Sequence, residues 1–306
     1  MEIINLNQDV LKGLEFFSKN RPAKLDLNQF KMPFVVGSEG AYFTGHNLFA
    51  GRSAIHANES NFKSLIDSYS EIIKQGLIND AVIISASGEK DAIWEIDYAK
   101  RNNLKTTLLT CSPESAGARI ADQVIVYKKI AEPYTYNFST YFGMVISVTG
   151  ENPKKIKDFL KKLKISGHIK KSKYYSFILP DKYEYIAQML KTKDDELFGP
   201  HSMVRAYTEG KARHAKFVVR SDKELVIGLG VKNKFFGQPD KRWDIKIPAW
   251  ADTGFITSLG YYITGLVQEN NLPYFKKHIE NYCKDYGPKA YGKDDNFDPI
   301  VPGSKG

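Results

Sequence analysis

Short apolar segments alternate with helix-like patterns through the first half of the chain, and this alternation constrains the fold more than any other feature. The segments expected as strands are 33–36, 54–57, 81–84, 106–109 and 124–127. Helical spacing of apolar residues lies between them, most clearly over 62–73 and 93–99. Strands that alternate with helices predict a parallel sheet covered on both faces. A helix with its apolar face over 10–17 precedes this α/β region.

The second half repeats the alternation less regularly. The expected strands are 174–179, 217–219 and 224–231, and the expected helices are 183–190, 201–214, 255–267 and 273–283. A lysine-rich segment, 151–173, separates the halves. We therefore predict two domains: residues 1–150, with the N-terminal helix and the first sheet, and residues 151–306, with the linker, the second sheet and a C-terminal tail without periodicity.

The formal charge of +9 raises the question of nucleic acid binding. Segment 151–173 holds nine lysines against Glu151 and Asp158, so it accounts for most of the surplus. Ile156, Phe159 and Leu160 recur there at helical spacing, which makes the lysines the solvated face of an amphipathic helix. No RNA-binding aromatic motif accompanies them. We rank a nucleic-acid-binding role behind the alternatives below.

Composition excludes several other classes. Apolar residues make up 42% of the chain, enough for a large core, yet no apolar run is long enough to span a membrane. The first 17 residues do not resemble a signal peptide. Two distant cysteines, Cys111 and Cys283, argue against a disulfide framework and indicate a reducing cytoplasm. No histidine or cysteine pair has metal-ligand spacing and no P-loop occurs, so we expect neither a metal nor another cofactor.

The stretch DAVIISASGEK, residues 80–90, places hydroxyls and a glycine at the end of a buried strand. Ligands of parallel sheets bind beyond the carboxyl ends of the strands, where helix N-termini point. Ser85, Ser87, Gly88 and Lys90 would there offer hydroxyls, backbone N–H groups and a positive charge to a phosphate. A capped turn that binds nothing would have the same composition, since serine is a common N-cap. The loop 37–40, with Gly37, Ser38 and Gly40, follows an earlier strand in the same way.

These loops, with TTLLT at 106–110 and ARIADQVIVY at 118–127, resemble a sugar isomerase (SIS) domain. The family has a five-stranded parallel sheet between helices and binds phosphosugars, and SASGEK is similar to its S-x-S-G-E-T phosphate loop, with Lys90 in place of threonine. The second half resembles a further copy, as in phosphoglucose/phosphomannose isomerases and the isomerase half of glucosamine-phosphate synthase. The resemblance implies two flavodoxin-like α/β/α subdomains with parallel sheets.

The double-domain members of that family isomerise sugar phosphates with a glutamate of the second half as the base. Glu209, within YTEGKARHAKF, resembles this base by its position, although an exposed glutamate beside Lys211 and Arg213 would look the same. The resemblance implies an aldose–ketose isomerase that transfers a proton through a cis-enediol. The alternative is a SIS protein that binds or senses a phosphosugar without catalysis.

The family's ring-opening histidine has no counterpart in the expected loop, RSDKELVIGLG. His46 and His201 are the remaining candidates, and each reads equally well as a structural or exposed histidine. The segment 132–144 corresponds to one that passes near the sugar in the family, so the resemblance makes Thr135 a sugar-binding candidate, with Glu132 and Ser139 as weaker ones. Packing explains its aromatic residues as easily.

The expected partner is therefore a sugar phosphate. We expect no specific nucleic acid, no membrane and a homodimer, the last only because the resemblance implies it.

Overall fold

The computed structural model describes residues 3–304, and these form two compact units. We call them the five-stranded unit, residues 20–130, 139–150 and 304, and the four-stranded unit, residues 3–19, 131–138 and 151–303. The chain thus enters the four-stranded unit three times. Helix α1 (Leu6–Lys19) packs on helices of the four-stranded unit, whereas the predicted division at residue 150 assigned this helix to the first sheet.

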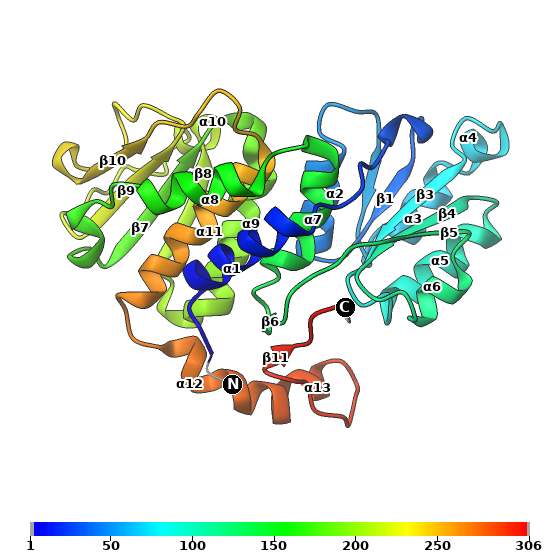
Figure 1. Cartoon of the computed structure of the whole chain (residues 1–306). Coiled ribbons are helices and arrows are strands. Elements are labelled where there is room, and N and C mark those ends of the chain that lie inside the picture. Colours follow the sequence, from blue (N-terminus) through cyan, green and yellow to red (C-terminus); the bar gives the residue numbers. More distant parts are fainter. Residues whose placement is uncertain (1–2, 305–306) are drawn as a thin grey trace. The chain divides into compact units, whose positions relative to one another are not determined.

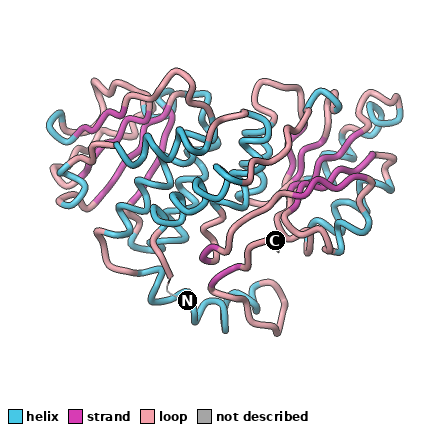
Figure 2. Tube along the Cα trace, viewed as in Figure 1, coloured by secondary structure: helices cyan, strands magenta, loops and turns pink. Residues whose placement is uncertain are grey.

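The five-stranded unit is a wholly parallel sheet in the order β2-β1-β3-β4-β5 (Figures 1 and 2). Its strands are β1 (Phe34–Val36), β2 (Ile55–Ala57), β3 (Asp80–Ile84), β4 (Lys105–Thr110) and β5 (Gln123–Val126). Its helices are α2 (Gly40–Leu48), α3 (Phe62–Ser68), α4 (Ser70–Lys74), α5 (Asp91–Arg101), α6 (Ala116–Ile120) and, except for its first residue, α7 (Phe138–Thr149). All five predicted strands of this sheet are confirmed.

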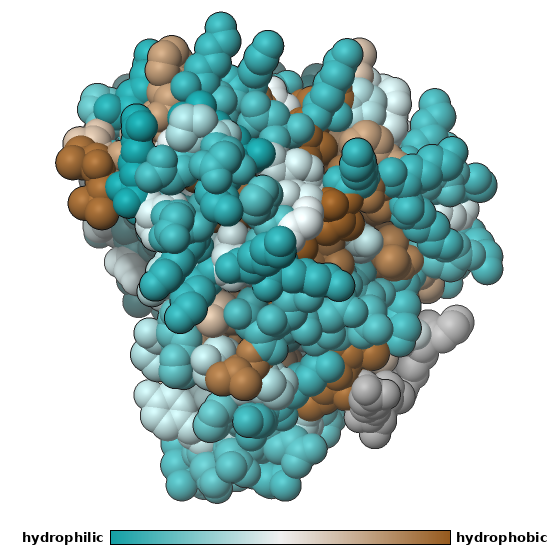
Figure 3. Space-filling view, turned by 90° about the vertical axis from the view of Figure 1, so that its left-hand side faces the viewer, coloured by the Kyte–Doolittle hydropathy of each residue, from teal (hydrophilic) through white to brown (hydrophobic). Residues whose placement is uncertain are grey.

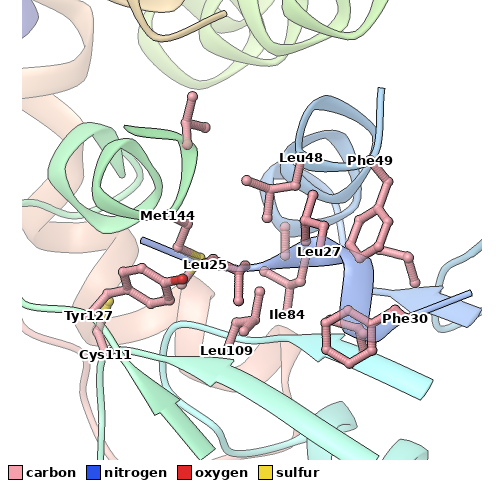
Figure 4. Packing of buried hydrophobic residues seen from close by; sticks show 14 residues of the cluster. Leu25, Leu27, Phe30, Leu48, Phe49, Ile84, Leu109, Cys111, Tyr127 and Met144 are labelled. Atoms are coloured by element: carbon pink, nitrogen blue, oxygen red, sulfur yellow. The ribbon is translucent and has the colours of Figure 1, made fainter. Parts of the chain in front are cut away.

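Side chains on alternate positions of the strands build two separate cores. One face of the sheet carries Val35, Val82, Ile84 and Leu109, which pack with Leu48 of α2 and Met144 of α7 (Figure 4). The opposite face carries Phe34, Ala81, Ile83 and Leu108, packed against Phe62 and Ile66 of α3 and Ile96 of α5. Burial on both faces explains the continuous apolar runs of these strands. The sheet is therefore the middle layer of an α/β/α sandwich.

The four-stranded unit is built on a second parallel sheet, in the order β10-β9-β7-β8. Its strands are β7 (Tyr174–Leu179), β8 (Val204–Thr208), β9 (Glu224–Leu229) and β10 (Arg242–Ile245). Its other helices are α8 (Pro153–Lys162), α9 (Glu184–Phe198), α10 (Glu209–Ala212), α11 (Thr253–Glu269), α12 (Tyr274–Asn281) and α13 (Gly287–Ala290). The predicted α/β class with parallel sheets is confirmed in both units.

The two faces of this second sheet are covered differently. Helix α9 packs on β8 and β7, α11 on β9, and α1 and α8 pack against α11. The other face carries Ile178 and Val226, which are covered by Phe217, Val231, Phe236 and Ala212. Except for Ala212, which ends α10, these covering residues come from irregular segments, 213–223 and 230–241. Loops therefore take the place of a full helical layer over this part of the sheet.

Two predictions for the second half are wrong, and one strand was not predicted. The helix expected over 201–214 is instead strand β8 followed by the single turn α10, because the side chains of Val204, Ala206 and Thr208 alternate in burial with their neighbours. Residues 217–219 form no strand: Phe217 is buried and the next two valines are exposed. Strand β10 lies at the edge of the sheet. It was not predicted because its sequence, RWDI, is polar and half-exposed and lacks an apolar run.

The C-terminal tail also has structure where none was predicted. Strand β11 (Ile300–Val301) pairs antiparallel with β6 (Glu132–Pro133). The ring of Phe297 stacks on Tyr134 with centroids 5.5 Å apart. The tail is thus held against the segment that precedes α7.

Candidate functional site

The five-stranded unit has its topological switch point between β1 and β3. The two strands are adjacent and parallel, but α2, which follows β1, packs on one face, whereas α5, which follows β3, packs on the other. The two connecting loops consequently diverge at the carboxyl edge of the sheet. Such a divergence is the place where open α/β sheets bind ligands. The loops are the predicted ones: Gly37, Ser38 and Gly40 after β1, and residues 85–90 after β3.

The loop 85–90 is held by its own hydroxyls. The backbone N–H of Gly88 donates to Oγ of Ser85 at 3.1 Å, and that of Glu89 donates to Oγ of Ser87 at 3.3 Å. Ser85 is half-buried and Ser87 is exposed. Both serines therefore shape the turn, and the hydroxyl of Ser87 stays accessible to solvent.

A second loop, between β4 and α6, clamps this turn from outside. The carbonyl of Ala86 accepts from the N–H of Cys111 at 3.0 Å and from Oγ1 of Thr110 at 3.1 Å. The carbonyl of Gly88 accepts from the N–H of Gly117 at 2.8 Å, and Oε1 of Glu89 accepts from the N–H of Ala116 at 2.9 Å. The turn is therefore fixed before any ligand arrives, which lowers the entropy lost on binding.

Gly88 is required by the close approach of the two loops. Its φ is +62°, and a Cβ added there would lie 2.1 Å from Oγ of Ser115 and 2.8 Å from Cβ of the same residue. Ser115 is buried and caps α6 by accepting from the N–H of Ala118. A larger residue at position 88 would push these loops apart.

The residues that begin α2 and α5 share an unusual backbone conformation. Glu39, the N-cap of α2, has φ 43° and ψ −111°, and Lys90, the N-cap of α5, has φ 54° and ψ −117°. In neither case does the side chain cap its helix. Non-glycine residues hold such a conformation only where the surroundings impose it, and these positions cluster at ligand sites. Two helix N-termini without a side-chain cap therefore lie on neighbouring loops.

Gly37 and Gly40 permit α2 to start close to the sheet and to α7. A Cβ at Gly37 would lie 2.8 Å from Cβ of Ala41 and 3.1 Å from the carbonyl oxygen of Ile84. A Cβ at Gly40 would lie 2.9 Å from the ring of Tyr141. Both glycines thus position the first loop beside the second.

The remaining predicted residues, Glu209 and Thr135, belong to the four-stranded unit. Glu209 directly follows β8, at the carboxyl edge of the second sheet, and is the first residue of α10. Thr208 caps this turn, and the N–H of Gly210 donates to Oδ1 of Asp181 at 2.7 Å. The side chain of Glu209 is exposed, and no hydrogen bond or ion pair to its carboxylate occurs among residues 3–304. The carboxylate is therefore accessible to a substrate.

Thr135 lies elsewhere in the same unit. Its carbonyl accepts from Nζ of the buried Lys193 in α9, whereas Lys211, in α10, pairs with Glu184 at the start of α9. Nine residues of α-helix separate the two contacts, a rise of about 13 Å. Thr135 has φ 72°, and its Oγ1 is buried without a hydrogen-bond partner in the described chain. The structure does not bring Thr135 and Glu209 together.

The polar neighbours of Thr135 have structural roles. Glu132 is buried in the β6–β11 pair, and Oγ of Ser139 accepts from the N–H of Ile130 at 3.2 Å.

The candidate histidines are engaged in ring stacking. The rings of His46 in α2 and His56 in β2 lie face to face, with centroids 3.6 Å apart. Burial lowers the pKa of His46 to about 3, helped by the neighbouring His56, and burial lowers that of His56 to about 4. The ring of His201, in the four-stranded unit, stacks on Tyr274 with centroids 3.9 Å apart. His214 is exposed in the irregular segment after α10.

A buried acid, Glu95, lies one turn into α5, the helix that follows the loop 85–90. Glu95 is 2% exposed, and its Oε1 has no hydrogen-bond partner within residues 3–304. Burial first, and then the charges of Asp91 and Glu59, raise its pKa to about 8. Sequence reasoning missed this residue because Glu95 reads as part of a polar helix face.

The clamp from 110–117 was missed as well. Its signal in the sequence is the run TCSPESAG, which places hydroxyls and a glycine after β4 as SASG does after β3. Over residues 3–304 no cluster of three potential metal ligands occurs, and no helix there is long and apolar enough to cross a bilayer.

Comparison with known proteins reveals the fold. No protein-family model matches the sequence, and no curated protein matches it. Solved structures do: tagatose-6-phosphate ketose/aldose isomerase from Escherichia coli aligns with 88% of this chain and 92% of its own, at 11% identity and a TM-score of 0.57. The C-terminal domain of glucosamine-fructose-6-phosphate aminotransferase from Francisella tularensis aligns over 89% and 95%, at 15% identity and a TM-score of 0.56.

Glucosamine-6-phosphate deaminase from Thermotoga maritima aligns over 87% of this chain and 91% of its own, at 13% identity and a TM-score of 0.51. At such identities the likeness establishes a shared α/β fold and does not establish a shared reaction.

Proposed function

We propose that the five-stranded unit binds the phosphate of a sugar phosphate between the loops 37–40 and 85–90. One observation carries this proposal: the N-termini of α2 and α5 at the switch point have no side-chain cap. Their N-cap residues, Glu39 and Lys90, hold strained backbone conformations. Helix N-termini favour anions through their N–H groups and dipoles. The exposed hydroxyl of Ser87 and the ammonium of Lys90 add a hydrogen bond and a charge.

The proposed reaction is aldose–ketose isomerisation with Glu209 as the base. The carboxylate takes the proton from C2 of the open-chain aldose, the electron pair of that C–H bond forms the C1–C2 double bond, and the carbonyl π pair moves to O1. The hydroxyl proton of C2 passes to O1 by way of the cis-enediol, and C2=O forms as the C1–C2 π pair takes a proton at C1 from the protonated Glu209, which yields the ketose. While Glu209 holds the proton, it can exchange with solvent. Glu209 suits this role because its carboxylate is exposed at the carboxyl edge of a parallel sheet.

The second candidate is binding without catalysis. Among the described residues of the 209–223 segment, the one histidine is His214, which is exposed and stands five residues beyond the proposed base. A protein without a ring-opening acid would hold the cyclic sugar phosphate unchanged.

Solvent exchange distinguishes these functions. A sugar phosphate that cannot close a ring, such as a tetrose 4-phosphate, is supplied in heavy water, so that ring opening is not needed, and deuterium at C1 or C2 is followed by NMR. An isomerase incorporates deuterium, and Glu209→Gln lowers the rate by about 10²- to 10⁴-fold while binding changes only a few-fold. Binding without exchange in the wild type would leave the second candidate.

Binding itself is measured by thermal shift, since a ligand of the folded state raises the unfolding midpoint. A sugar phosphate should stabilise the protein more than the parent sugar does. Equal stabilisation by both would remove the phosphate site from the proposal.

A further inference from the structure

Three strongly exposed apolar side chains lie on the loop-covered face of the four-stranded unit. Val218 is 77% exposed, Val219 81% and Phe235 71%. They belong to the segments 213–223 and 230–241, whose inner residues Phe217 and Phe236 pack over the sheet with ring centroids 5.2 Å apart. Nη2 of Arg220 donates to the carbonyl of Phe235 at 3.3 Å, which joins the two segments at their outer side. We call these three side chains the apolar tip.

The loop that carries Phe235 is rigid. Oδ1 of the buried Asn233 accepts from the N–H groups of Phe235 and Phe236, and its Nδ2 donates to the carbonyl of Phe236. Arg242 also donates to the carbonyl of Phe236 and to two further carbonyls of the loop, those of Lys234 and Gly237. These hydrogen bonds fix the backbone of the loop in a conformation that leaves the side chain of Phe235 in solvent. Exposed apolar side chains held in this way mark interaction sites.

Exposed basic side chains lie in the same two segments as the apolar tip. The two segments contain six exposed basic residues against the exposed acidic residues Asp222 and Asp240. The basic residues are Arg213, Lys216, Arg220, Lys223, Lys232 and Lys234. An anionic partner fits this charge, whereas a second copy of the same surface would be repelled.

We propose that the apolar tip and the basic residues of its two segments bind an anionic phospholipid surface. Two consecutive valines exposed by more than three quarters stand out from the surface, and a lipid interface accepts such protruding side chains without a matching pocket. Lysine and arginine in the same segments attract anionic headgroups. The two valines have no ring on which a base could stack and no donor to read one, so Phe235 alone offers a ring at the tip, which disfavours nucleic acid. The face of the molecule shown in Figure 3 is mostly hydrophilic, with apolar residues exposed in a few separate places.

Vesicle co-sedimentation of the full chain tests the proposal. The probes are vesicles of phosphatidylcholine alone and of phosphatidylcholine mixed with phosphatidylglycerol, at about 100 mM salt, where the screening length is about 10 Å. The protein should sediment with the mixed vesicles and stay in solution with the neutral ones. Replacing Val218, Val219 and Phe235 together by serine should lower the partition coefficient at least tenfold. Each replacement removes apolar surface that would otherwise be buried in the lipid.

Matched variants separate the apolar tip from general charge. Leu77→Ser combined with Leu272→Ser removes leucines that are 60% and 61% exposed elsewhere, and partitioning should not change. Lys216→Gln, Lys232→Gln and Lys234→Gln together should weaken partitioning, whereas the same change at Lys154, Lys161 and Lys162 of α8 should have a much smaller effect.

Each contrary result overturns the proposal. Sedimentation that depends equally on both lysine sets would be general electrostatics, and no sedimentation with anionic vesicles would leave no lipid site. Tighter binding to single-stranded DNA or polyglutamate with the same residue dependence would assign a different partner. If the triple serine variant does not fold, Phe235→Trp replaces it: its indole emission should shift to shorter wavelength with anionic vesicles, and an unchanged spectrum contradicts insertion.

Discussion

Helices α2 and α5 of the five-stranded unit and helix α11 of the four-stranded unit begin in opposite ways. In the five-stranded unit, α2 and α5 begin at the carboxyl edge of the sheet without a side-chain cap. In the four-stranded unit, the carboxylate of Glu151 binds the N-terminus of α11. Its Oε1 accepts from the N–H groups of Asp252 and Phe255, and its Oε2 accepts from that of Gly254. A helix N-terminus already filled by an anion has little left for a ligand. The comparison supports our proposal that an anion binds to the five-stranded unit.

Buried acids show the same contrast. Glu224 in β9 accepts hydrogen bonds from Ser176 and from Arg205, whose Nη2 lies 2.6 Å away. Glu95 in α5 has an oxygen without a partner within residues 3–304. Glu224 thus stabilises the second sheet through its hydrogen bonds, whereas Glu95 is a buried acid of the five-stranded unit with an oxygen that is not hydrogen-bonded within residues 3–304. Four substitutions test this difference.

The largest effect should come from Glu95→Gln. The folded pKa of about 8 lies above the value near 4.5 of the unfolded chain, so the folded state holds a proton that the unfolded state releases between these two values. Wild-type stability should therefore fall by about 1.4 kcal/mol per pH unit through that window. Glu95→Gln should remove this loss, so the variant gains on wild type as the pH rises towards 8. Unfolding in urea at several pH values measures it, and parallel pH profiles would contradict a protonated Glu95.

Gly88→Ala should destabilise the five-stranded unit by about 3 kcal/mol, which combines backbone strain with the clash against Ser115. The response to sugar phosphate should be lost as well. Gly51→Ala is the matched control, because Gly51 has φ +73° in the same unit but nothing within 4 Å of an added Cβ. If both variants lose the same stability, the close approach of the two loops has no energetic weight.

Glu151→Gln should cost about 2 kcal/mol, since an amide offers a single uncharged acceptor in place of the charged group that binds three N–H donors. Chemical denaturation gives the value, with the exposed Glu71→Gln as control. A second experiment sharpens the comparison: Glu151→Ala should make the four-stranded unit respond to inorganic phosphate, which wild type should not do there. If Glu151→Gln leaves the free energy of unfolding unchanged, α11 does not depend on the carboxylate of Glu151.

Ser87→Ala should have the smallest effect, a loss of about 1 to 2 kcal/mol in sugar-phosphate binding, the contribution of one hydrogen bond to a charged group. Folding should hardly change, because the hydroxyl accepts one long bond from Glu89 on an exposed loop. Titration calorimetry measures the difference, and Ser68→Ala, an exposed hydroxyl on α3, is the control. Unchanged affinity would exclude Ser87 from the site.

Prediction from sequence succeeded best where strands are buried on both faces. The apolar run 81–84 could only be a central strand, and SASGEK after it could only lie at the carboxyl edge, so the loop is where the pattern predicted it. It failed where a short edge strand carries charged residues. VRAYT in β8 and RWDI in β10 are each four or five residues long, and only the neighbouring strand β7 or β9 gives them their conformation.

The sequence by itself determined the α/β class, the parallel sheets and the loops 37–40 and 85–90, because periodicity and the residue types at strand ends are local properties of the chain. Only the tertiary structure decided that Ser115 leaves no room for a Cβ at Gly88, that Glu151 fills the start of α11, and that Glu95 is buried. These facts depend on residues that are 27 to 104 positions apart in the chain or, for Glu95, on the packing around it. Burial and distance between such residues arise only when the sheets bring them together.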